Sequence, residues 1–281
     1  MKKANSEYST KELCKLFALS SSTYYEQTRI KLVSAEQVNL IAAIKRIAKD
    51  SGDTYGKRRM KPELHKRGFT LGLYRTASMM KKANVIAITP KKRHYYPDGG
   101  KSNIKADNLL ARQFEPGTLN THWVGDITYI HTYEGWSYLA SVLDLGSKEI
   151  IGWSMSTHPN AELALSALKN AIIKQQPDMS KLMFHSDQGV QYSSGLFSAH
   201  LLDNGITQSM SRRGNCWDNA VMERFFRSLK SERLNHLKLI NHYSAVSTVD
   251  SYIRFYNCKR LHSALGYITP VQRTVELRKV A

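Results

Sequence analysis

The spacing of apolar residues is helical over the first 88 positions of the chain and changes to that of β-strands after position 118. Within residues 34–52, apolar side chains recur every three or four positions, which predicts an amphipathic helix. Ser34 is its expected N-cap, Gln37 completes a capping-box pattern, and Gly52 is its expected end. The first part of the chain is therefore predicted to be helical.

Two pairs of shorter segments on either side of this helix have helix-turn-helix spacing. Residues 9–17, opened by the capping residue Ser9, and residues 21–29 form the weaker pair. Residues 56–68 and 73–84 form the second pair, which is rich in Lys and Arg. Two interpretations of the second pair stay open, a DNA-binding module and a small helical bundle with solvated charges.

Residues 89–117 connect the helical part to the rest of the chain. Their first portion, 89–108, contains Pro, Gly, adjacent Tyr residues and several Lys and Arg, with no apolar period. This composition is typical of a linker, and its positive charge suits contacts with phosphates.

The second part of the chain begins with three β-segments joined by short turns, which predicts an antiparallel meander. A helix capped by Asn160 follows, and strands then alternate with helices. The expected strands are 122–130, 135–145, 147–156, 181–186 and 206–210, and the expected helices are 161–175, 195–205 and 218–234. This order predicts an α/β fold, a mixed five-stranded sheet flanked by helices.

Positive charge is concentrated in the helical part of the chain. The 281 residues carry a formal net charge of +18. Residues 1–117 hold 24 Lys and Arg against 10 Asp and Glu, a net of +14, and residues 118–281 hold 17 against 13, a net of +4. This asymmetry indicates a polyanion-binding region joined to another domain, although a basic surface that only confers solubility would look the same.

The composition also argues against several classes of protein. No apolar run approaches the roughly 18 residues that span a bilayer, and the N-terminus lacks the apolar segment of a signal peptide. We therefore expect a cytoplasmic protein. Cys14, Cys216 and Cys258 are odd in number and far apart, which predicts reduced thiols and supports neither a disulfide framework nor a zinc finger.

Three acidic residues occupy unusual places in the predicted order of elements. Asp126 interrupts the apolar strand "HWVGDITYI", where a buried carboxylate needs a partner, a proton or a metal. Asp187 follows the 181–186 strand, and Glu223 lies on the last long helix. Singly, each has an ordinary explanation as a core ion pair, a turn cap or a solvated residue. Together they form the kind of oxygen-rich set that binds Mg²⁺ or Mn²⁺.

Two divalent ions about 4 Å apart can activate a water or hydroxyl and stabilise the leaving oxygen of a phosphodiester. Among the neighbours of the three acids, Asp144 is interpreted as a structural residue that ends its strand. His185 could orient a metal ligand or have a structural role, and the structural role is favoured. Trp217 is interpreted as a core residue in preference to a base-stacking platform.

Blocks along nearly the whole chain resemble the OrfB transposase of the insertion sequence 3 family, a DDE recombinase with a retroviral-integrase-type core. Asp126, Asp187 and Glu223 match its D,D,35,E pattern, since 35 residues separate the second and third acids. Lys230 lies seven residues after Glu223, where this family carries Lys or Arg. Further matching blocks are "YGKRR", "NLLARQF", "YLASVLDLGSKEIIGW", "HSDQGVQYSS", "SMSRRGNCWDNAVMERFFRSLKSE" and "YNCKRLHSALGYITP".

The resemblance implies an RNase H-like core, 3′-end cleavage at terminal inverted repeats, and strand transfer. It implies two Mg²⁺ ions per active site, which Mn²⁺ can replace, with Asp126 bridging both ions, Asp187 on one and Glu223 on the other. It also implies DNA as the substrate, an OrfA or OrfAB fusion partner, a homo-oligomer on paired ends, and association with the bacterial nucleoid when DNA is bound.

Seven basic residues are expected to contact DNA. Three lie in the second helical pair, two in a loop before the last catalytic helix, and two on the helix face that carries Glu223, near the scissile phosphate. They are Lys57, Arg58 and Arg59, then Arg212 and Arg213, then Arg227 and Lys230.

The chain is expected to divide into five regions. They are a short helix-turn-helix-like segment (1–33), a helical DNA-binding domain (34–88), a basic linker (89–117), the RNase H-like core (118–235) and a helical C-terminal extension (236–281). Two other functions stay open, a non-catalytic DNA-binding regulator derived from a transposase and a nuclease that only hydrolyses. The complete set of acids argues against the first, and the helical modules argue against the second.

Overall fold

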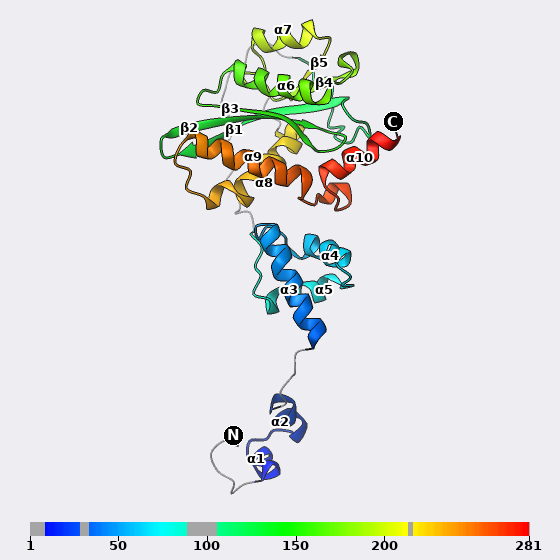
Figure 1. The fold of residues 1–281 in the computed structure, drawn as a ribbon, viewed down its shortest axis with the longest axis vertical. Helices are drawn as coiled ribbons and strands as arrows, with labels where there is room; N and C mark the ends of the chain where they lie inside the picture. The colour runs from blue at the N-terminus through cyan, green and yellow to red at the C-terminus, as the bar shows by residue number, and fades with distance from the viewer. Residues whose placement is uncertain (1–8, 29–33, 89–105, 213–215, 281) are drawn as a thin grey trace.

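A mixed five-stranded sheet forms the centre of the second part of the chain in the computed structural model (Figure 1). The structure describes residues 9–28, 34–88, 106–212 and 216–280. The strands are β1 His122–Thr132, β2 Gly135–Asp144, β3 Ile150–Ser156, β4 Met183–Ser186 and β5 Thr207–Met210. Their order across the sheet is β3-β2-β1-β4-β5, which confirms the predicted mixed sheet.

Strand β1 is central and is buried on both faces near its start. It pairs antiparallel with β2 and parallel with β4. Because successive side chains point to opposite faces, Trp123 enters one hydrophobic core and Val124 enters the other. Both side chains are fully buried. This explains why the first residues of β1 are apolar without alternation.

Helices cover both faces of the sheet (Figure 1). On one face lie α6 Ala161–Gln175 and α7 Gly195–Asp203, and on the other lie α8 Ala220–Glu232 and α9 His242–Cys258, with α10 Pro270–Val280 beside α9. Short 3₁₀ turns occur at Met179–Lys181, Cys216–Asn219, Leu234–His236 and Ser263–Leu265. Side chains of α8 and α9 share one core with β1, β2 and β3, so the C-terminal helices pack directly on the sheet.

The first part of the chain is helical, as predicted. Its helices are α1 Thr10–Leu16, α2 Ser21–Thr28, α3 Ala35–Asp50, α4 Lys57–Lys66 and α5 Leu73–Lys82. The capping box of Ser9 with Glu12 is present in both directions, and Ser34 accepts a hydrogen bond from the backbone N–H of Gln37. Buried residues of α3, α4 and α5, among them Ile44, form a separate small core.

This small helical core is joined to the C-terminal segment of the chain, after α9. The Tyr55 hydroxyl donates to the carbonyl oxygen of Lys259 at 2.9 Å and accepts from the Leu261 N–H at 2.8 Å. Leu261 itself is buried among the side chains of α3, α4 and α5. Residues about 200 positions apart therefore fix the α3–α5 module against the region that follows α9.

Three element boundaries differ from the sequence prediction for identifiable reasons. β3 begins at Ile150 because residues 144–149 form a turn, in which the Lys148 N–H bonds to the Asp144 carbonyl at 2.8 Å and Lys148 has a φ of 61°. β4 begins at Met183, after a 3₁₀ turn, instead of at 181. Another 3₁₀ turn precedes α8, which therefore begins at Ala220 instead of 218.

Two predictions drawn from composition can be compared with the described residues. Within them, no helix combines the length and apolar character needed to cross a bilayer. Cys14 is a buried free thiol and Cys258 an exposed one, in agreement with the prediction that these residues form no disulfide.

Asn257 on α9 provides a stability test of the contact between this helix and the sheet. Its amide donates to the Ile150 carbonyl at 2.8 Å and accepts from the Ile150 N–H at 2.9 Å, and all these groups are buried. Asn257→Ala would leave two buried backbone groups of β3 unpaired. We expect the free energy of unfolding, measured by urea denaturation, to fall by about 2 kcal/mol or more.

Asn170→Ala is the matched control for this measurement. Asn170 is exposed on α6 and donates to the Trp153 carbonyl of the same strand at 3.0 Å. Its removal leaves that carbonyl accessible to water, so a change within about 0.5 kcal/mol is expected. Equal losses in the two variants would show that Asn257 does not fix α9 to β3.

Candidate active site

Asp126 lies on β1, on the face of the sheet that α8 covers. Val124, two positions earlier, packs in the same core as Met222 and Phe225 of α8, and side chains two apart in a strand share a face. The Asp126 side chain is half-buried, and its Oδ1 accepts from the Ile127 N–H at 2.7 Å. The carboxylate is thus held on the central strand of the sheet, which is paired on both sides.

Asp187 follows β4, the strand that pairs parallel with β1. The register pairs Val124 with His185, and two residues further along each strand come Asp126 and Asp187. Neighbouring strands are about 4.8 Å apart, so this register brings the two acids to one edge of the sheet. The Asp187 Oδ1 accepts from the Gly189 N–H at 3.0 Å, which orients the carboxylate within its turn.

Glu223 lies in the first turn of α8 and is exposed. Arg227 and Lys230 follow at i+4 and i+7, on the same face of the helix. Arg227 is exposed and Lys230 is half-buried. The opposite face of α8 carries Met222, Phe225, Phe226 and Leu229 into the core, so packing of these residues decides which way Glu223 points.

The electrostatics of Asp126 link the three acids. Burial raises the pKa of Asp126 well above its usual range, and the negative charges of Asp187 and Glu223 raise it further. The Ile127 N–H and the positive charge of Lys230 act in the opposite direction. Asp126, Asp187, Glu223 and Lys230 are therefore close enough to interact, and negative charge accumulates at this edge of the sheet.

The three acids do not form a complete metal site among the described residues. In residues 9–28, 34–88, 106–212 and 216–280, no group of three or more His, Cys, Asp or Glu side chains is arranged to hold a metal ion. The donor chemistry nevertheless suits a divalent cation, because carboxylate oxygens are the ligands that Mg²⁺ prefers and a cation would offset the repulsion that raises the pKa of Asp126.

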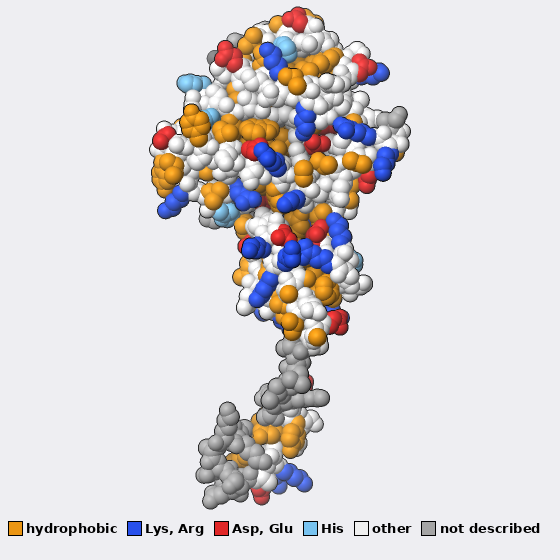
Figure 2. Space-filling view, in the orientation of Figure 1, with side chains coloured by type: hydrophobic (Ala, Val, Ile, Leu, Met, Phe, Trp, Pro, Cys, Tyr) orange, Lys and Arg blue, Asp and Glu red, His pale blue; other side chains and the backbone are white. Residues whose placement is uncertain are grey.

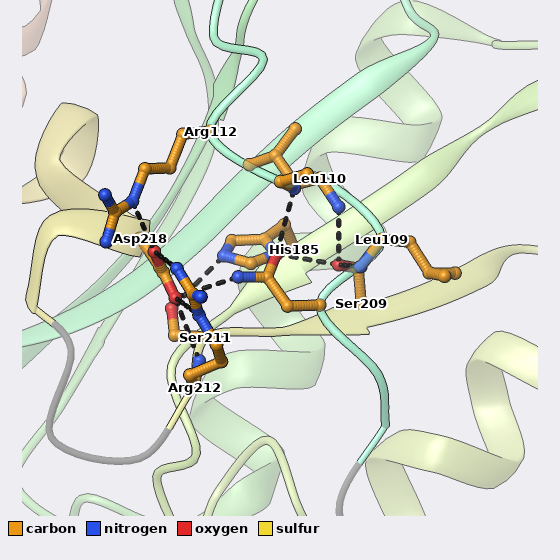
Figure 3. Close-up of polar contacts among 10 residues, drawn as sticks. Leu109, Leu110, Arg112, His185, Ser209, Ser211, Arg212 and Asp218 are labelled. Atoms are coloured by element: carbon orange, nitrogen blue, oxygen red, sulfur yellow. Dashed lines mark hydrogen bonds and ion pairs between the residues drawn. The ribbon is translucent and has the colours of Figure 1, made fainter.

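Asp218 anchors the segment that leads into α8, and sequence reasoning missed it (Figure 3). Its buried carboxylate accepts from the Arg212 Nε at 3.1 Å, the Arg112 Nε at 2.7 Å and the Asn108 Nδ2 at 2.8 Å. The hydrogen bond from Arg212 is the main cause that holds the pKa of Asp218 far below its usual range. The signal in the sequence was an acid at the first residue of the predicted 218–234 helix, which is typical of an ordinary helix start.

His185 has a structural role in the same cluster, as the favoured interpretation had it (Figure 3). Its Nδ1 lies 2.9 Å from the Ser209 hydroxyl and its Nε2 lies 3.2 Å from the Ser211 hydroxyl. Burial lowers the pKa of His185 to about 4, so the ring is neutral near pH 7. Through these two hydroxyl groups it connects β4 to β5 and to the residue that follows β5.

The residues predicted to contact DNA lie in different surroundings, some exposed and some in ion pairs. Lys57 and Arg58 are exposed at the start of α4, whereas the Arg59 guanidinium lies 3.4 Å from Glu232. Arg212 forms the ion pair with Asp218, and Arg213 lies outside the described residues. Their roles in DNA binding stay predictions, but Arg59 and Arg212 also have intramolecular partners that the sequence did not reveal.

The exposure of Trp217 differs from the prediction, and no prediction was made for Tyr192. Trp217 is 69% exposed, so its interpretation as a core residue is wrong; it lies in the 3₁₀ turn that precedes α8. Tyr192, not singled out in the sequence, is buried, and its pKa is raised well above the usual value by burial and by the charges of Asp126 and Asp187. Asp144 is buried at the end of β2, as predicted.

The fold and the site define the class of protein. A family model described as an integrase core domain matches residues 118–216, and a second one with the same description matches residues 204–270. A model described as an HTH-like domain matches residues 35–93. The chain therefore combines an integrase core with an N-terminal HTH-like region.

Curated relatives identify the family. The insertion element IS600 uncharacterized 31 kDa protein of Shigella sonnei is 36% identical over 263 residues, 92% of this chain and 96% of the relative. Transposase InsF for insertion sequence IS3A of Escherichia coli (strain K12) is 33% identical over 281 residues, 97% of this chain and 96% of the relative. The chain belongs to the insertion sequence 3 family of transposases.

Solved structures of viral integrases are also similar to this chain. The HTLV-2 integrase catalytic core domain in complex with magnesium, in its trimeric form, is 18% identical, with a TM-score of 0.44, over 55% of this chain and 96% of that chain. The simian T-cell lymphotropic virus intasome in complex with PP2A regulatory subunit B56 gamma is 15% identical, with a TM-score of 0.49, over 82% of this chain and 73% of that chain.

Asp144 gives a pH test of the structural role assigned to it. Burial raises its pKa from 3.8 to about 7, and its Oδ2 is buried with no hydrogen-bond partner among the described residues. The folded state therefore binds this proton more tightly than the unfolded chain does, and the stabilisation that results is lost as pH rises through about 7. Asp144→Asn should reduce the loss of stability between pH 5 and pH 7.5.

The measurement is the urea midpoint of both proteins at the two pH values. Asp178→Asn is the control, because Asp178 is exposed and its pKa is lowered by Lys181 and Ser180, which places its titration below this pH range. It should keep the pH dependence of the original protein. An Asp144→Asn variant with that same dependence would contradict a proton on Asp144 in the folded state.

Proposed function

We propose that this chain is a DNA transposase that cleaves the 3′ ends of its element and joins them to DNA at an active site formed by Asp126, Asp187 and Glu223. The observation that supports the proposal is the parallel register of β1 and β4, in which Asp126 and Asp187 each follow the paired Val124 and His185 by two residues. The helix α8, which carries Glu223, packs in the same core as Val124. The raised pKa of Asp126, caused first by burial and then by the charges of Asp187 and Glu223, agrees with this arrangement. Membership of the insertion sequence 3 family supplies the reaction class, polynucleotidyl transfer.

The proposed reaction has two chemically similar steps. In cleavage, a water oxygen attacks a phosphorus atom, the bond from that phosphorus to the 3′ oxygen breaks, and a 3′ hydroxyl is released. In strand transfer, that hydroxyl attacks a second phosphodiester and displaces another 3′ oxygen. One phosphorus–oxygen bond forms and one breaks in each step, so the chain's task is to position the reacting groups and to offset negative charge.

Asp126, Asp187 and Glu223 are the residues that would hold divalent ions, two per site. Bound Mg²⁺, or Mn²⁺ in its place, would activate the attacking oxygen and stabilise the leaving oxygen. Asp126 is suited to its part because β1 fixes its position, and Lys230 is suited to offset the charge of a phosphate beside the three acids.

The basic first part of the chain supports DNA as the substrate. Residues 1–117 carry a net charge of +14, and an HTH-like domain covers residues 35–93. Lys57 and Arg58, exposed on α4, are the proposed phosphate contacts of this region. We further propose that the chain acts as a homo-oligomer on paired ends, with an OrfA or OrfAB partner.

A non-catalytic DNA-binding protein is the second candidate. The observation in its favour is that no group of three metal-binding side chains is assembled among the described residues. The two candidates separate on one reaction. The purified chain is incubated with a duplex that contains the flanking ends of its element and with Mg²⁺, and the products are mapped on a sequencing gel.

The decisive variant in this reaction is Asp126→Asn. It keeps the size of the side chain and removes the charge, so cleavage and strand transfer should fall at least about 100-fold because interactions with the reacting groups are lost. DNA binding in a gel-shift assay should stay within about twofold. Asp178→Asn, which removes an exposed carboxylate of the same domain, is the control and should keep full activity.

The outcomes separate the candidates cleanly. An Asp126→Asn protein as active as the original would overturn the proposed site. Binding without any metal-dependent product, in the original protein and with an OrfA partner present, would establish the second candidate. Cleaved but never joined ends would establish a hydrolytic nuclease.

The proposed DNA contacts of α4 are tested by Lys57→Ala combined with Arg58→Ala. Each lost phosphate contact should lower the slope of log affinity against log salt by about 1, so the slope should fall by about 2 for any duplex sequence. Fluorescence anisotropy at several salt concentrations measures it. Lys169→Ala, exposed on α6, is the control, and a slope unchanged in both variants would remove α4 from the DNA interface.

A further inference from the structure

A cavity of about 300 Å³ lies where the α3–α5 module meets the catalytic part. Its walls come from α4, the turn after β2, α8 and the segment that follows α9. The charged and titratable side chains that line it are Arg59, Glu115, Lys148, Arg224, Tyr256, Arg260 and His262. Four cations and one carboxylate lie in the lining itself, and Glu232 contacts two of the cations from outside it. The cavity therefore has an excess of positive charge, and its size is at the lower end of ligand pockets.

Arg260 and Arg59 are only partly neutralised by their surroundings. The buried Arg260 guanidinium binds Glu232 through Nε at 2.8 Å and Nη2 at 2.7 Å. Arg59 shares the same carboxylate at 3.4 Å. Two guanidinium groups therefore share the charge of Glu232, and one positive charge is left over.

Lys148 and Arg224 add positive charge that no carboxylate neutralises by direct contact in the described part of the chain. The Lys148 ammonium donates to the carbonyl oxygens of Phe114 and Leu145, which are neutral acceptors. Arg224 is exposed and forms no ion pair within the described ranges. With Glu115 and Glu232 counted, the cavity has a net charge of about +2, since four cations stand against two carboxylates.

His262 adds a polar group without a partner. Its Nδ1 is buried and has no hydrogen-bond partner among the described residues, and the ring lines the cavity. Burial, and then the positive charges of Arg260 and Arg59, lower the pKa of His262 to about 4. A neutral imidazole can donate one N–H to an anion without adding to the charge repulsion.

The cavity lies next to the two regions proposed above to bind DNA, α4 and the helix that carries Glu223. Arg224 and Ser228, four residues apart on α8, line it, whereas Glu223 and Arg227 lie on the adjacent face of that helix. Arg59, which also lines the cavity, lies at the start of α4, next to the exposed Lys57 and Arg58. Lys and Arg side chains gather on both sides of this junction in Figure 2. The cavity is therefore lined by both α4 and α8, the helices that carry Lys57 and Glu223.

We propose that this cavity binds a backbone phosphate of the DNA, so that one strand is held simultaneously by the HTH-like module and by the helix that carries Glu223. The inference rests on the proposed function for its ligand, a nucleic acid. The excess of positive charge, the mixed guanidinium, ammonium and imidazole donors, and the room for a phosphate with its sugar are its physical basis. The bound phosphate would also neutralise charges that now repel one another across the junction.

Two variants of the full chain test the proposal by different means. Arg224→Gln removes one exposed cation from the cavity. Ala264 is an exposed residue of the cavity wall, and Ala264→Trp fills the cavity without changing its charge. Fluorescence anisotropy with a 20-base-pair duplex in metal-free buffer should show, for each, a slope of log affinity against log salt lower by about 0.9. Between 50 and 200 mM salt, this difference amounts to about threefold in affinity.

Arg254→Gln is the matched control, because Arg254 is an exposed arginine of α9 that pairs with Asp250 and does not line this cavity. It should keep the original slope. Calorimetric melting of every variant shows that it is folded. A folded Ala264→Trp protein with the original slope and affinity would overturn the proposal, because diffuse positive charge would then be sufficient. If Ala264→Trp does not fold, an unchanged slope for Arg224→Gln has the same consequence.

A second arm identifies the source of the phosphate. Inorganic phosphate alone is titrated into the original protein and into Arg224→Gln, and the melting temperature is recorded. Stabilisation of the original protein by millimolar phosphate, together with an unchanged DNA slope in both variants, would overturn the assignment to DNA and indicate a free phosphate ligand. Because every readout is binding without metal, the result is independent of whether Asp126→Asn abolishes catalysis.

Discussion

The parallel pairing of β1 with β4 is the constraint on which the site depends. β1 is held on one side by the antiparallel β2 and on the other by β4, and its first residues are buried on both faces. A slip of one residue would exchange Trp123 and Val124 between two cores, so the register is strongly specified. Asp126 and Asp187 each lie two residues beyond the paired Val124 and His185, so packing of apolar residues decides where these two acids lie.

The third acid depends on a helix that is tied down at both of its ends. At the start of α8, the buried Asp218 binds Arg112 and Arg212. At its last residue, Glu232 binds Arg260 and accepts from the Tyr252 hydroxyl at 2.9 Å. Between these two ion clusters the apolar face of α8 packs in the core, and Glu223 stays on the open face. Removal of either cluster would free the helix that carries the proposed catalytic glutamate.

The same ion cluster at the end of α8 connects the two functional parts of the protein. Arg59 of the HTH-like module reaches Glu232, and Tyr55 bonds to the backbone on both sides of Arg260. The HTH-like module is thereby fixed to the helix that carries Glu223 by partly buried polar contacts. Removal of one partner of such a contact destabilises the folded state, because the charge of the other partner stays buried.

The sequence by itself determined the fold class and the family and was sufficient to propose the three acids, because strand alternation, helix caps and the spacing from Asp187 to Glu223 are local or linear features. It could not determine which basic residues are free to meet DNA. Arg59 and Arg212 have partners, Glu232 and Asp218, whose importance depends on folding. Trp217 was misjudged for the same reason, since a large aromatic residue predicts burial only on average. Charge pairing and exposure are set by contacts between residues far apart in the chain, and only the tertiary structure brings those residues together.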